Sequence, residues 1–382
     1  LILGGSQENT ILSCEGQADL GHTVGLAFGP IYGPEGSLLE RVQRHGGIEA
    51  IETRYLEREL KPVTDWRCYG ELRRLIREWK PDIVHTHSSK AGIIGRAAAW
   101  KEGGKAGRVG VVHTIHGLAY HPYQSKRKNA IYIAAERFAA KRCHTIVSVA
   151  DAMTEQSLAA GVGRAEQYIT VRSGMEVETF LEPGVTRGDV RRELGLADDD
   201  LVFGTVARLA ELKGHDDLLD ALGDDLRANK HWKLLWVGDG WWAKRLLGRV
   251  REMGLQEQVI STGLVPPQRV PATLQAMDVL IHPSYREGLP RTVPQALLSA
   301  VPVIANDVDG TREACIPEKT GILVQPGDLD ELREAVRWMA AHPEERRALG
   351  EAGRAMCREE FSAEKMVERL EVVYADTLKS IQ

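Results

Sequence analysis

One strand–helix–strand stretch constrains the fold more than any other part of the 382-residue sequence. Its first apolar run, Val279–Ile281, is followed by Pro283 and predicts a buried parallel strand. Apolar residues then recur at helical spacing over Val293–Ala300, and a second apolar run begins at Val301. This order places the intervening loop, Glu287–Pro290, in the crevice at the carboxyl ends of the strands, where open α/β sheets bind ligands.

The residues of this loop suit a ligand that carries phosphate groups or sugar hydroxyls. The N–H groups of Gly288 and Leu289 come just before the predicted helix, so we expect them near its positive N-terminal end. Glu287 can accept hydrogen bonds from sugar hydroxyls. A carboxylate at this place is also a common helix-stabilising residue, so Glu287 alone does not decide between the two roles.

The alternation of strand and helix recurs along both halves of the chain and predicts parallel sheets covered by helices on both faces. The length fits two α/β domains. Glu182–Asp200, with its proline, glycines and acidic run, is the linker candidate. We predict a first domain over residues 1–182, a second over 183–361, and a C-terminal helix, 362–382, that packs back onto the first.

Several local expectations follow from the same patterns. We expect helices over Thr10–Leu20 and Glu344–Ile381, and a strand over Tyr168–Met175 that closes the first domain. The apolar run Leu1–Leu3 stands directly before Gly4 and reads as the end of a first strand. We expect most of that strand to be missing from the sequence.

The composition argues against several classes of protein. The net charge of -5 argues against a nucleic-acid-binding protein, which is usually basic. The 5 cysteines are scattered without C-x-x-C spacing, so they indicate neither a zinc site nor a disulfide framework and favour a reducing cytoplasm. No apolar run approaches the roughly 20 residues that span a bilayer.

Further candidates stand at other predicted strand ends. Arg208 and Lys213 flank a loop after an apolar strand, where two cations can hold a diphosphate, Arg as a fork and Lys as a point charge. Turns that let a backbone approach an anionic or flat ligand closely occur at Gly4, Gly5, Gly238, Gly240, Gly263 and Leu264. Considered alone, each of these two cations could equally be an ordinary surface charge, and each glycine could equally belong to an ordinary turn without a ligand.

Polar residues also end two strands of the first half. His85, His87 and Ser88 follow one strand, and His116 follows another, so we expect them to line one cleft and assign the first three to the acceptor side. Satisfied structural histidines are the alternative for each. None has a carboxylate or cysteine at ligand spacing, so we predict no metal site.

The segment 126–143 mixes basic residues with Ile131, Tyr132 and Phe138. This pattern suits contact with an anionic membrane surface. The alternative is a solvated helix that packs its apolar side into the core, and the alanine-rich spacing of the segment favours this alternative.

Four ordered motifs in the second half carry a family resemblance: Gly204–Leu209 with Lys213-Gly214, Val237–Gly240, Glu287–Pro290 and Gly310–Glu313. With them the chain resembles the retaining glycosyltransferases of family 4, group 1 type. The first half resembles the family more loosely, through Gly4-Gly5, Asp82–His87, His116-Gly117 and Val171–Met175. The resemblance covers nearly the whole chain and implies the GT-B architecture, an α/β fold of two Rossmann-like doubly wound domains facing a central cleft.

The resemblance implies an enzyme that moves a sugar, with retention of configuration and without a metal ion or cofactor, from a nucleotide-sugar to an acceptor hydroxyl. A UDP-sugar is the favoured donor, and a glycan, a lipid-linked molecule or a small molecule the acceptor. The implied catalytic residues are His116, Arg208, Lys213 and Glu287. The implied donor-binding residues add Gly288, Leu289, Pro290 and Gln295 to the turns named above. A cytoplasmic location is implied, with contact at the inner face of the membrane as a further option.

Two positions depart from the family pattern. The pattern has a second Glu eight residues after Glu287, where it binds ribose hydroxyls, but Gln295 stands there. An amide offers one acceptor and one donor, so nucleotide affinity or preference can differ. Ser173 replaces the usual Asn before Gly174, a change of small consequence.

Three other functions are compatible with this architecture. A sugar-nucleotide epimerase needs its own acid–base carboxylates, and a phosphorylase needs a pyridoxal lysine; the sequence shows a signature for neither. A nucleotide-sugar-binding protein without transferase activity is the third, and Gln295 favours it.

Overall fold

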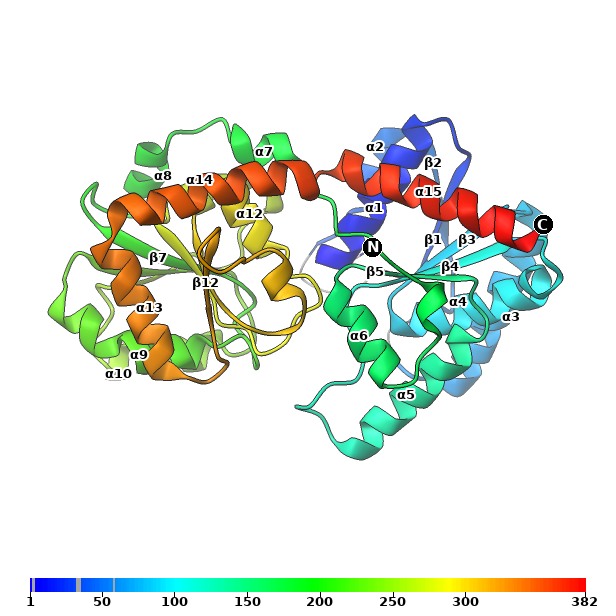
Figure 1. Ribbon diagram of the computed structural model, residues 1–382, viewed down its shortest axis with the longest axis horizontal. Coiled ribbons are helices and arrows are strands. Elements are labelled where there is room, and N and C mark those ends of the chain that lie inside the picture. The colour runs from blue at the N-terminus through cyan, green and yellow to red at the C-terminus, as the bar shows by residue number, and fades with distance from the viewer. Residues whose placement is uncertain (2–3, 32–35, 58) are drawn as a thin grey trace. The chain divides into compact units, whose positions relative to one another are not determined.

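The computed structural model describes residues 1, 4–31, 36–57 and 59–382. Its contacts divide the chain into two compact α/β units. Unit 1 consists of Leu1–Met175 and Ala363–Gln382, and unit 2 of Glu176–Ser362 (Figure 1). The predicted α/β class with parallel sheets is confirmed. Residues 176–182 belong to unit 2 in this division, whereas the sequence prediction placed them in the first domain.

Unit 1 is built on parallel strands in the orders β1-β2 and β3-β4-β5-β6. The strands are β1 (Val24–Phe28), β2 (Ile48–Glu52), β3 (Ile83–His87), β4 (Gly110–Ile115), β5 (Thr145–Ser148) and β6 (Tyr168–Thr170). The helices are α1 (Gly5–Asp19), α2 (Leu39–His45), α3 (Pro62–Trp79), α4 (Ser89–Glu102), α5 (Lys126–Ala140), α6 (Asp151–Ala159) and α15 (Ala363–Ile381), with short 3-10 turns η1 (Gly104–Ala106) and η2 (Ala165–Gln167).

The C-terminal helix α15 completes the core of unit 1. Met366, Leu370 and Val373 recur at helical spacing along α15 and pack with Leu12 of α1 and Val112 of β4. Figure 1 shows α1 and α15 on one face of the strands, and α3, α4 and α5 on the other. Unit 1 therefore joins two ends of the chain around its parallel strands.

Unit 2 contains one six-stranded parallel sheet in the order β12-β11-β10-β7-β8-β9. Its strands are β7 (Leu201–Val206), β8 (Trp232–Val237), β9 (Val259–Ser261), β10 (Val279–His282), β11 (Val303–Asn306) and β12 (Gly321–Val324). Its helices are α7 (Val177–Leu181), α8 (Arg187–Glu193), α9 (His215–Ala228), α10 (Ala243–Glu252), α11 (Val270–Gln275), α12 (Thr292–Leu298), α13 (Leu329–Ala341) and α14 (Pro343–Glu360), with 3-10 turns η3 (Pro267–Arg269) and η4 (Asp309–Glu313).

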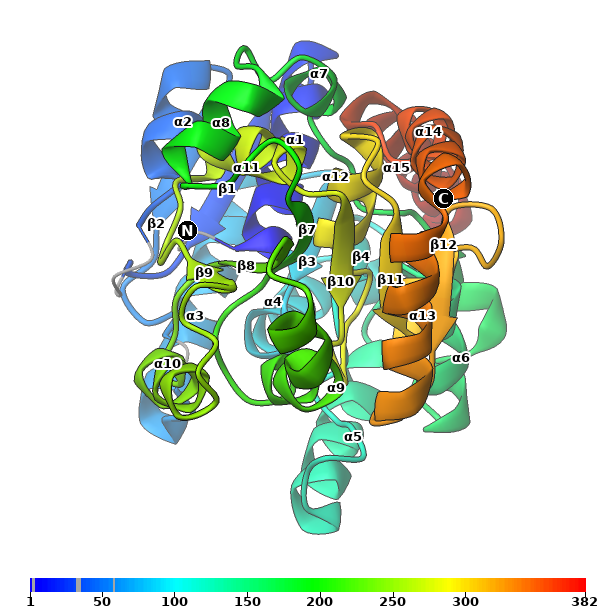
Figure 2. The same ribbon diagram turned by 90° about the vertical axis from the view of Figure 1, so that its left-hand side faces the viewer.

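This strand order is that of the doubly wound fold, and it reverses direction between β7 and β10. Figures 1 and 2 show α9 and α13 on one face of the sheet and α12 and α14 on the other. The core between the sheet and α9 holds Phe203, Trp236, Leu218 and Leu222, each fully buried or nearly so. A sheet covered on both faces explains why its strands read as continuous apolar runs.

Several predicted element bounds were wrong. The first helix begins at Gly5 instead of Thr10. The last strand of unit 1 ends at Thr170, because beyond Val171 the backbone leaves the ladder and the Gly174 N–H donates to Asn9 Oδ1 of α1 at 3.1 Å. Residues 2 and 3 of the predicted first strand lie outside the described residues.

The predicted helix Glu344–Ile381 is in fact two helices, α14 and α15. The break falls at Phe361, which is buried, and the Ala363 N–H then donates to the Met175 carbonyl at 3.0 Å. The break therefore coincides with the passage of the chain from unit 2 back to unit 1. Among the described helices, none is both long and apolar enough to cross a membrane.

Candidate active site

Two predicted ligand loops follow neighbouring strands of unit 2. Arg208 and Lys213 follow β7, Glu287 follows β10, and these two strands pair in parallel, with Phe203 opposite Val279. The strand order reverses at this pair, and the crevice outside the carboxyl ends of such strands is where doubly wound sheets bind ligands. The fold thus places the loops of Lys213 and Glu287 together at the expected position.

Lys213 and Glu287 form an ion pair in this crevice. Lys213 Nζ lies 2.5 Å from Glu287 Oε1, and the two side chains are 28% and 16% exposed. His282, the last residue of β10, is buried and places Nε2 3.2 Å from the same carboxylate oxygen. Its Nδ1 lies 3.2 Å from the Thr292 hydroxyl of α12. His282 was not predicted as a site residue, although a histidine at the end of a buried strand was a usable signal.

The neighbours of Glu287 keep it ionised. Burial alone would raise the pKa of this carboxyl, but the charge of Lys213 and the contact with His282 outweigh burial and hold the pKa well below its ordinary value. Glu287 is therefore an acceptor of hydrogen bonds and a weak base at neutral pH.

The loop of Glu287 is clamped to η4. The Glu287 N–H donates to Asp309 Oδ2 at 2.7 Å, and the Gly310 N–H donates to the Gly288 carbonyl at 3.0 Å. Asp309 adopts a φ of 46°, a left-handed conformation that is strained for a residue with a side chain. The Gly310–Glu313 motif thus holds the Glu287–Pro290 motif in place.

The helix expected after Gly288 and Leu289 is present. α12 begins at Thr292, one residue before the predicted Val293, and Pro290 disfavours the helical conformation of Leu289. Within the described chain, the N–H groups of Gly288 and Leu289 have no hydrogen-bond partner. They remain available to a ligand and come shortly before the N-terminus of α12. Gln295 lies half-buried on α12 itself.

Arg208 lies at the same end of β7 but on its exposed side. Its guanidinium carbon is 5.5 Å from the centre of the Trp241 ring, a cation–π arrangement, and Trp241 is 64% exposed. Trp241 in turn donates from Nε1 to Glu211 Oε2 at 2.8 Å. These contacts bring Lys213 and Glu287 together and place Arg208 against the Trp241 ring.

The glycines of unit 2 allow two loops to pack backbone to backbone. Gly238 has a φ of 137°, and a Cβ there would lie 2.2 Å from the Ala207 carbonyl oxygen; a Cβ at Gly240 would lie 2.3 Å from that of Leu209. The Gly238 N–H also donates to the Gly263 carbonyl at 3.0 Å. These glycines therefore fix the backbone around Arg208, and Leu264 beside them is exposed.

The predicted residues of unit 1 include a histidine pair. His87 Nδ1 lies 3.0 Å from His116 Nε2, across the carboxyl ends of β3 and β4. Both nitrogens of His85 are occupied, by the Tyr374 hydroxyl at 2.7 Å and the Thr114 hydroxyl at 2.7 Å. Burial lowers the pKa of His87 to about 4 and that of His85 well below its ordinary value. These two rings are therefore neutral at neutral pH.

Two further predicted positions of unit 1 are backbone features. Ser88 is exposed, directly after β3, with a φ of 64°. Gly4 precedes the first residue of α1, and its carbonyl accepts from the Glu8 N–H at 2.9 Å. Gly4 and Gly5 thus form the start of α1.

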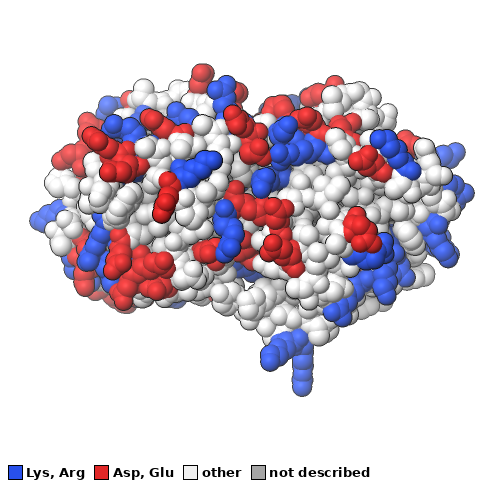
Figure 3. Space-filling model, viewed as in Figure 1, with Lys and Arg blue, Asp and Glu red and all other residues white. Residues whose placement is uncertain are grey.

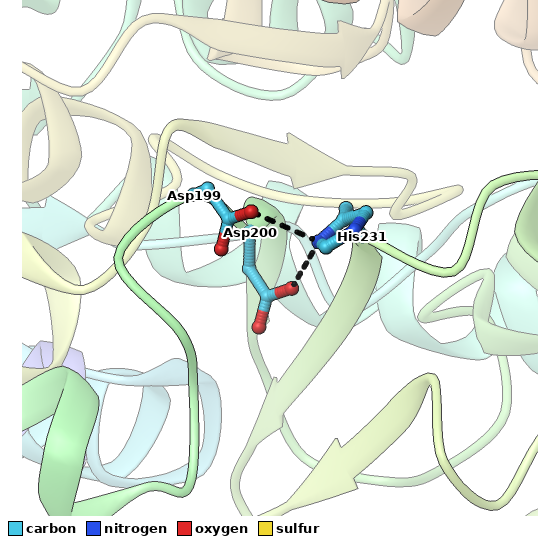
Figure 4. Close-up of side chains that lie close together, drawn as sticks. All are labelled: Asp199, Asp200 and His231. Carbon is cyan, nitrogen blue, oxygen red and sulfur yellow. Dashed lines mark ion pairs between the residues drawn. The ribbon is translucent and has the colours of Figure 1, made fainter.

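One cluster of possible metal ligands lies elsewhere in unit 2. His231 Nδ1 is 3.4 Å from an Asp199 carboxylate oxygen and 3.6 Å from an Asp200 oxygen (Figure 4). The aspartates directly precede β7 and the histidine directly precedes β8, so the cluster lies at the edge of the sheet opposite to Lys213 and Glu287. The close approach of these three side chains is explained by an ion pair between the turn before β7 and the turn before β8, which forms when His231 is protonated.

Two family models together match most of the chain. The model described as Glycosyl transferases group 1 matches residues 186–356, and the Glycosyl transferase 4-like domain matches residues 4–174. The chain belongs to the group 1 glycosyl transferases. The predicted family is thereby confirmed, and the protein is an enzyme, a glycosyltransferase.

Similar proteins support this assignment. The glycosyltransferase is 29% identical to a UDP-Gal:alpha-D-GlcNAc-diphosphoundecaprenol alpha-1,3-galactosyltransferase of Escherichia coli, over 76% of this chain and 74% of the relative. It is also 29% identical to a 2-deoxystreptamine glucosyltransferase of Streptomyces kanamyceticus, over 76% of each chain. Among solved structures, Anabaena Alr3699/HepE in complex with UDP has the same fold, with a TM-score of 0.79 at 20% identity, over 99% of this chain and 96% of that one.

Proposed function

We propose that this glycosyltransferase transfers a sugar from a UDP-sugar to a hydroxyl group, with retention of configuration and without a metal ion. The observation that carries the proposal is the Lys213–Glu287 ion pair at the switch point of unit 2. This pair offers a cation and a carboxylate side by side, and a nucleotide-sugar presents a diphosphate and hydroxyl groups side by side.

Donor binding would separate the Lys213–Glu287 ion pair, because Lys213 would bind the diphosphate and Glu287 the sugar. The diphosphate competes with Glu287 for Lys213, and Arg208 adds a second cation with several N–H donors. Glu287 is then released to accept hydrogen bonds from sugar hydroxyls, while the N–H groups of Gly288 and Leu289 complete the sugar site. The two cations would stabilise the charge that develops on the departing diphosphate, a role that a metal ion has in other enzymes.

Retention fits this role of Glu287. Direct inversion needs a carboxylate that removes the proton of the acceptor hydroxyl, whereas Glu287 in the proposed complex accepts hydrogen bonds from the hydroxyls of the donor sugar. In our proposal the bond between the sugar and the diphosphate breaks, and the acceptor oxygen bonds to the same face of the sugar. Its proton passes to an oxygen of the leaving diphosphate.

The relatives support UDP as the nucleotide of the donor, and their names indicate two different kinds of acceptor. The Escherichia coli relative is named for UDP-Gal and a diphosphoundecaprenol acceptor, and the Streptomyces relative for the small molecule 2-deoxystreptamine. The Anabaena neighbour holds UDP. We propose a UDP-sugar donor and a glycan or lipid-linked acceptor, with a small-molecule acceptor as the alternative.

Calorimetry with UDP-, GDP- and ADP-sugars tests the donor. We expect a UDP-sugar to bind, and Arg208→Ala to weaken its binding by about 1.5–3 kcal/mol, because a charge-assisted contact is lost. Glu287→Ala should abolish transfer and leave UDP binding largely intact. Lys244→Ala, which removes an exposed cation of α10, is the control. Unchanged affinity in Arg208→Ala together with unchanged transfer in Glu287→Ala would refute the proposed site.

Transfer assays test the mechanism. We expect full activity in the presence of a chelator, and an anomeric proton coupling in the product that matches the donor. A product of opposite anomeric configuration would overturn retention, and loss of activity that added Mg²⁺ restores would overturn metal independence.

We further propose a cytoplasmic enzyme that contacts the membrane through α5. Ile131 and Phe138, 66% and 46% exposed, are seven residues apart and so share one face of α5, and the helix begins with Lys126-Arg127-Lys128. This combination suits an anionic membrane surface, and the free thiols of all 5 cysteines fit a reducing compartment. Ile131→Ser should reduce flotation with anionic vesicles; flotation equal to that of the unaltered protein would count against this contact.

A further inference from the structure

Unit 1 carries a groove that no part of the proposed transfer reaction uses. The groove encloses about 860 Å³ where α4 and α5 end and β4 and β5 are about to begin. Trp100 and Phe138 contribute aromatic walls, and its basic lining residues are Lys101, Lys105, Arg108 and Arg142. These residues lie at the amino ends of the strands, whereas His87 and His116 lie at the carboxyl ends. The length of β4 separates the two edges by about 20 Å.

The positive charge of this groove is not compensated by acids. Among the described residues, no carboxylate lines the groove or pairs with Lys101, Lys105 or Arg108. The neighbouring acid Glu102 is occupied by Arg73 and by Arg77, the latter at 3.0 Å. Figure 3 shows lysine and arginine side chains gathered where Figure 1 shows α3, α4 and α5. Four cations without an acid are unexpected on a chain whose net charge is -5.

Helix ends account for only part of this charge. Lys101 and Arg142 lie at the C-terminal ends of α4 and α5, which favour cations. Each such end carries about half a negative charge, so two helix ends offset about one of the four positive charges. Lys105 lies in η1, and Arg108 lies in the turn between η1 and β4, so the ends of α4 and α5 do not explain these two cations. The groove therefore keeps a net positive field.

Arg142 is already oriented for a ligand. Its guanidinium carbon lies 3.6 Å from the centre of the Phe138 ring, and one of its N–H groups donates to the Phe138 carbonyl at 2.7 Å. The stacked guanidinium retains further N–H donors. An arginine fixed in this way loses little side-chain entropy when it binds an oxyanion.

We propose that this groove binds the phosphate group of a ligand that also carries a flat or apolar portion. Arg142 and the lysines would hold the phosphate oxygens by charge-assisted hydrogen bonds, and Trp100 and Phe138 would cover the apolar portion. The headgroup of an anionic phospholipid and a soluble aromatic phosphate ester both have this chemistry. The inference does not depend on the proposed transfer reaction, because binding is measured without a donor.

The test compares the unaltered protein with two charge-matched variants. Lys105→Gln/Arg108→Gln removes two exposed cations of the groove, and Arg44→Gln/Arg74→Gln removes two exposed arginines of α2 and α3. One arm measures calorimetric binding of phenyl phosphate, with phenol as the uncharged comparison. The other arm measures flotation with phosphatidylcholine vesicles that contain or lack phosphatidylglycerol. Thermal unfolding confirms that all three proteins are folded.

We expect the groove variant to lose about tenfold or more in affinity for the phosphate probe, and the control variant to match the unaltered protein. A loss confined to phenyl phosphate identifies a soluble ester as the ligand, and a loss confined to phosphatidylglycerol vesicles identifies a lipid headgroup. The proposal is overturned if the unaltered protein binds neither probe, if phenol binds as well as phenyl phosphate, or if the two variants behave alike.

Discussion

At the scale of single residues, the Lys213–Glu287 ion pair keeps Glu287 ionised, and we expect it to contribute to the free energy of unfolding. Removing one partner of such a pair leaves the other charge partly buried and uncompensated. We expect Lys213→Met to lower the free energy of unfolding by about 2 kcal/mol, less than for a fully buried pair because Lys213 is 28% exposed. Urea denaturation measures this loss. Lys230→Met, at an exposed lysine, is the control, and equal losses in both variants would contradict a structural ion pair.

The same pair makes stability depend on pH in a defined direction. The folded-state pKa of Glu287 is below its unfolded value, so its contribution to stability is present above the unfolded pKa of about 4.3 and is lost as the pH falls through the folded value. The difference in unfolding free energy between the unaltered protein and Glu287→Gln should therefore be constant near neutral pH and shrink below about pH 4. Denaturation at several pH values measures it. A difference that grows on acidification would reverse the assigned shift.

Sequence reasoning found part of this residue-scale site. Lys213 and Glu287 were predicted because both follow apolar runs, and parallel strands bring their carboxyl ends to one edge. His282 was missed because it closes an apolar run and reads as part of the strand. The order of β7 and β10 in the sheet, which places it 3.2 Å from Glu287, depends on long-range pairing that local patterns do not contain.

At the scale of elements, tertiary contacts moved several predicted bounds. Strand β6 ends before the predicted Met175, because the Gly174 N–H donates to the Asn9 side chain of α1 instead of to a neighbouring strand. Asn9 lies far from Gly174 in the sequence, so local patterns do not reveal this contact. Helix α12 was predicted to within two residues at each end, because apolar residues recur along it at helical spacing. The expected linker 182–200 contains the helix α8. Thr186 caps the N-terminus of this helix and was a usable signal in the sequence, but the proline and glycines nearby favoured a linker instead.

The glycine loops of unit 2 give a prediction at the scale of elements. Gly238→Ala places a Cβ against the Ala207 carbonyl, so the loop before Arg208 must shift. Gly254→Ala is the matched control, because Gly254 also has a left-handed φ, 68°, but open space around its Cβ. We expect Gly238→Ala to lower the free energy of unfolding by at least about 1 kcal/mol more than Gly254→Ala, and to weaken UDP-sugar binding. Equal effects of the two variants would show that backbone conformation alone, and not the close approach, restricts this loop.

At the scale of the whole molecule, the two units have separate cores. Leu370 of α15 is 3% exposed in the core of unit 1, and Leu222 of α9 is 1% exposed in that of unit 2. Each leucine replaced by alanine should destabilise its own unit by about 2–5 kcal/mol, through lost burial and a residual cavity. Hydrogen exchange should show reduced protection of β4 in Leu370→Ala and of β7 in Leu222→Ala. Reduced protection of both strands in both variants would show that the chain unfolds as one cooperative body.

The return of α15 to unit 1 has a consequence for synthesis on the ribosome. Unit 2 is one continuous segment, so everything that it requires emerges before residues 363–382 have been translated. Until those residues appear, the apolar surface formed by Leu12, Val112 and Val147 has no cover. The half of the chain that is made first is thus the last that can finish folding, and a nascent intermediate of this kind is a natural client for chaperones.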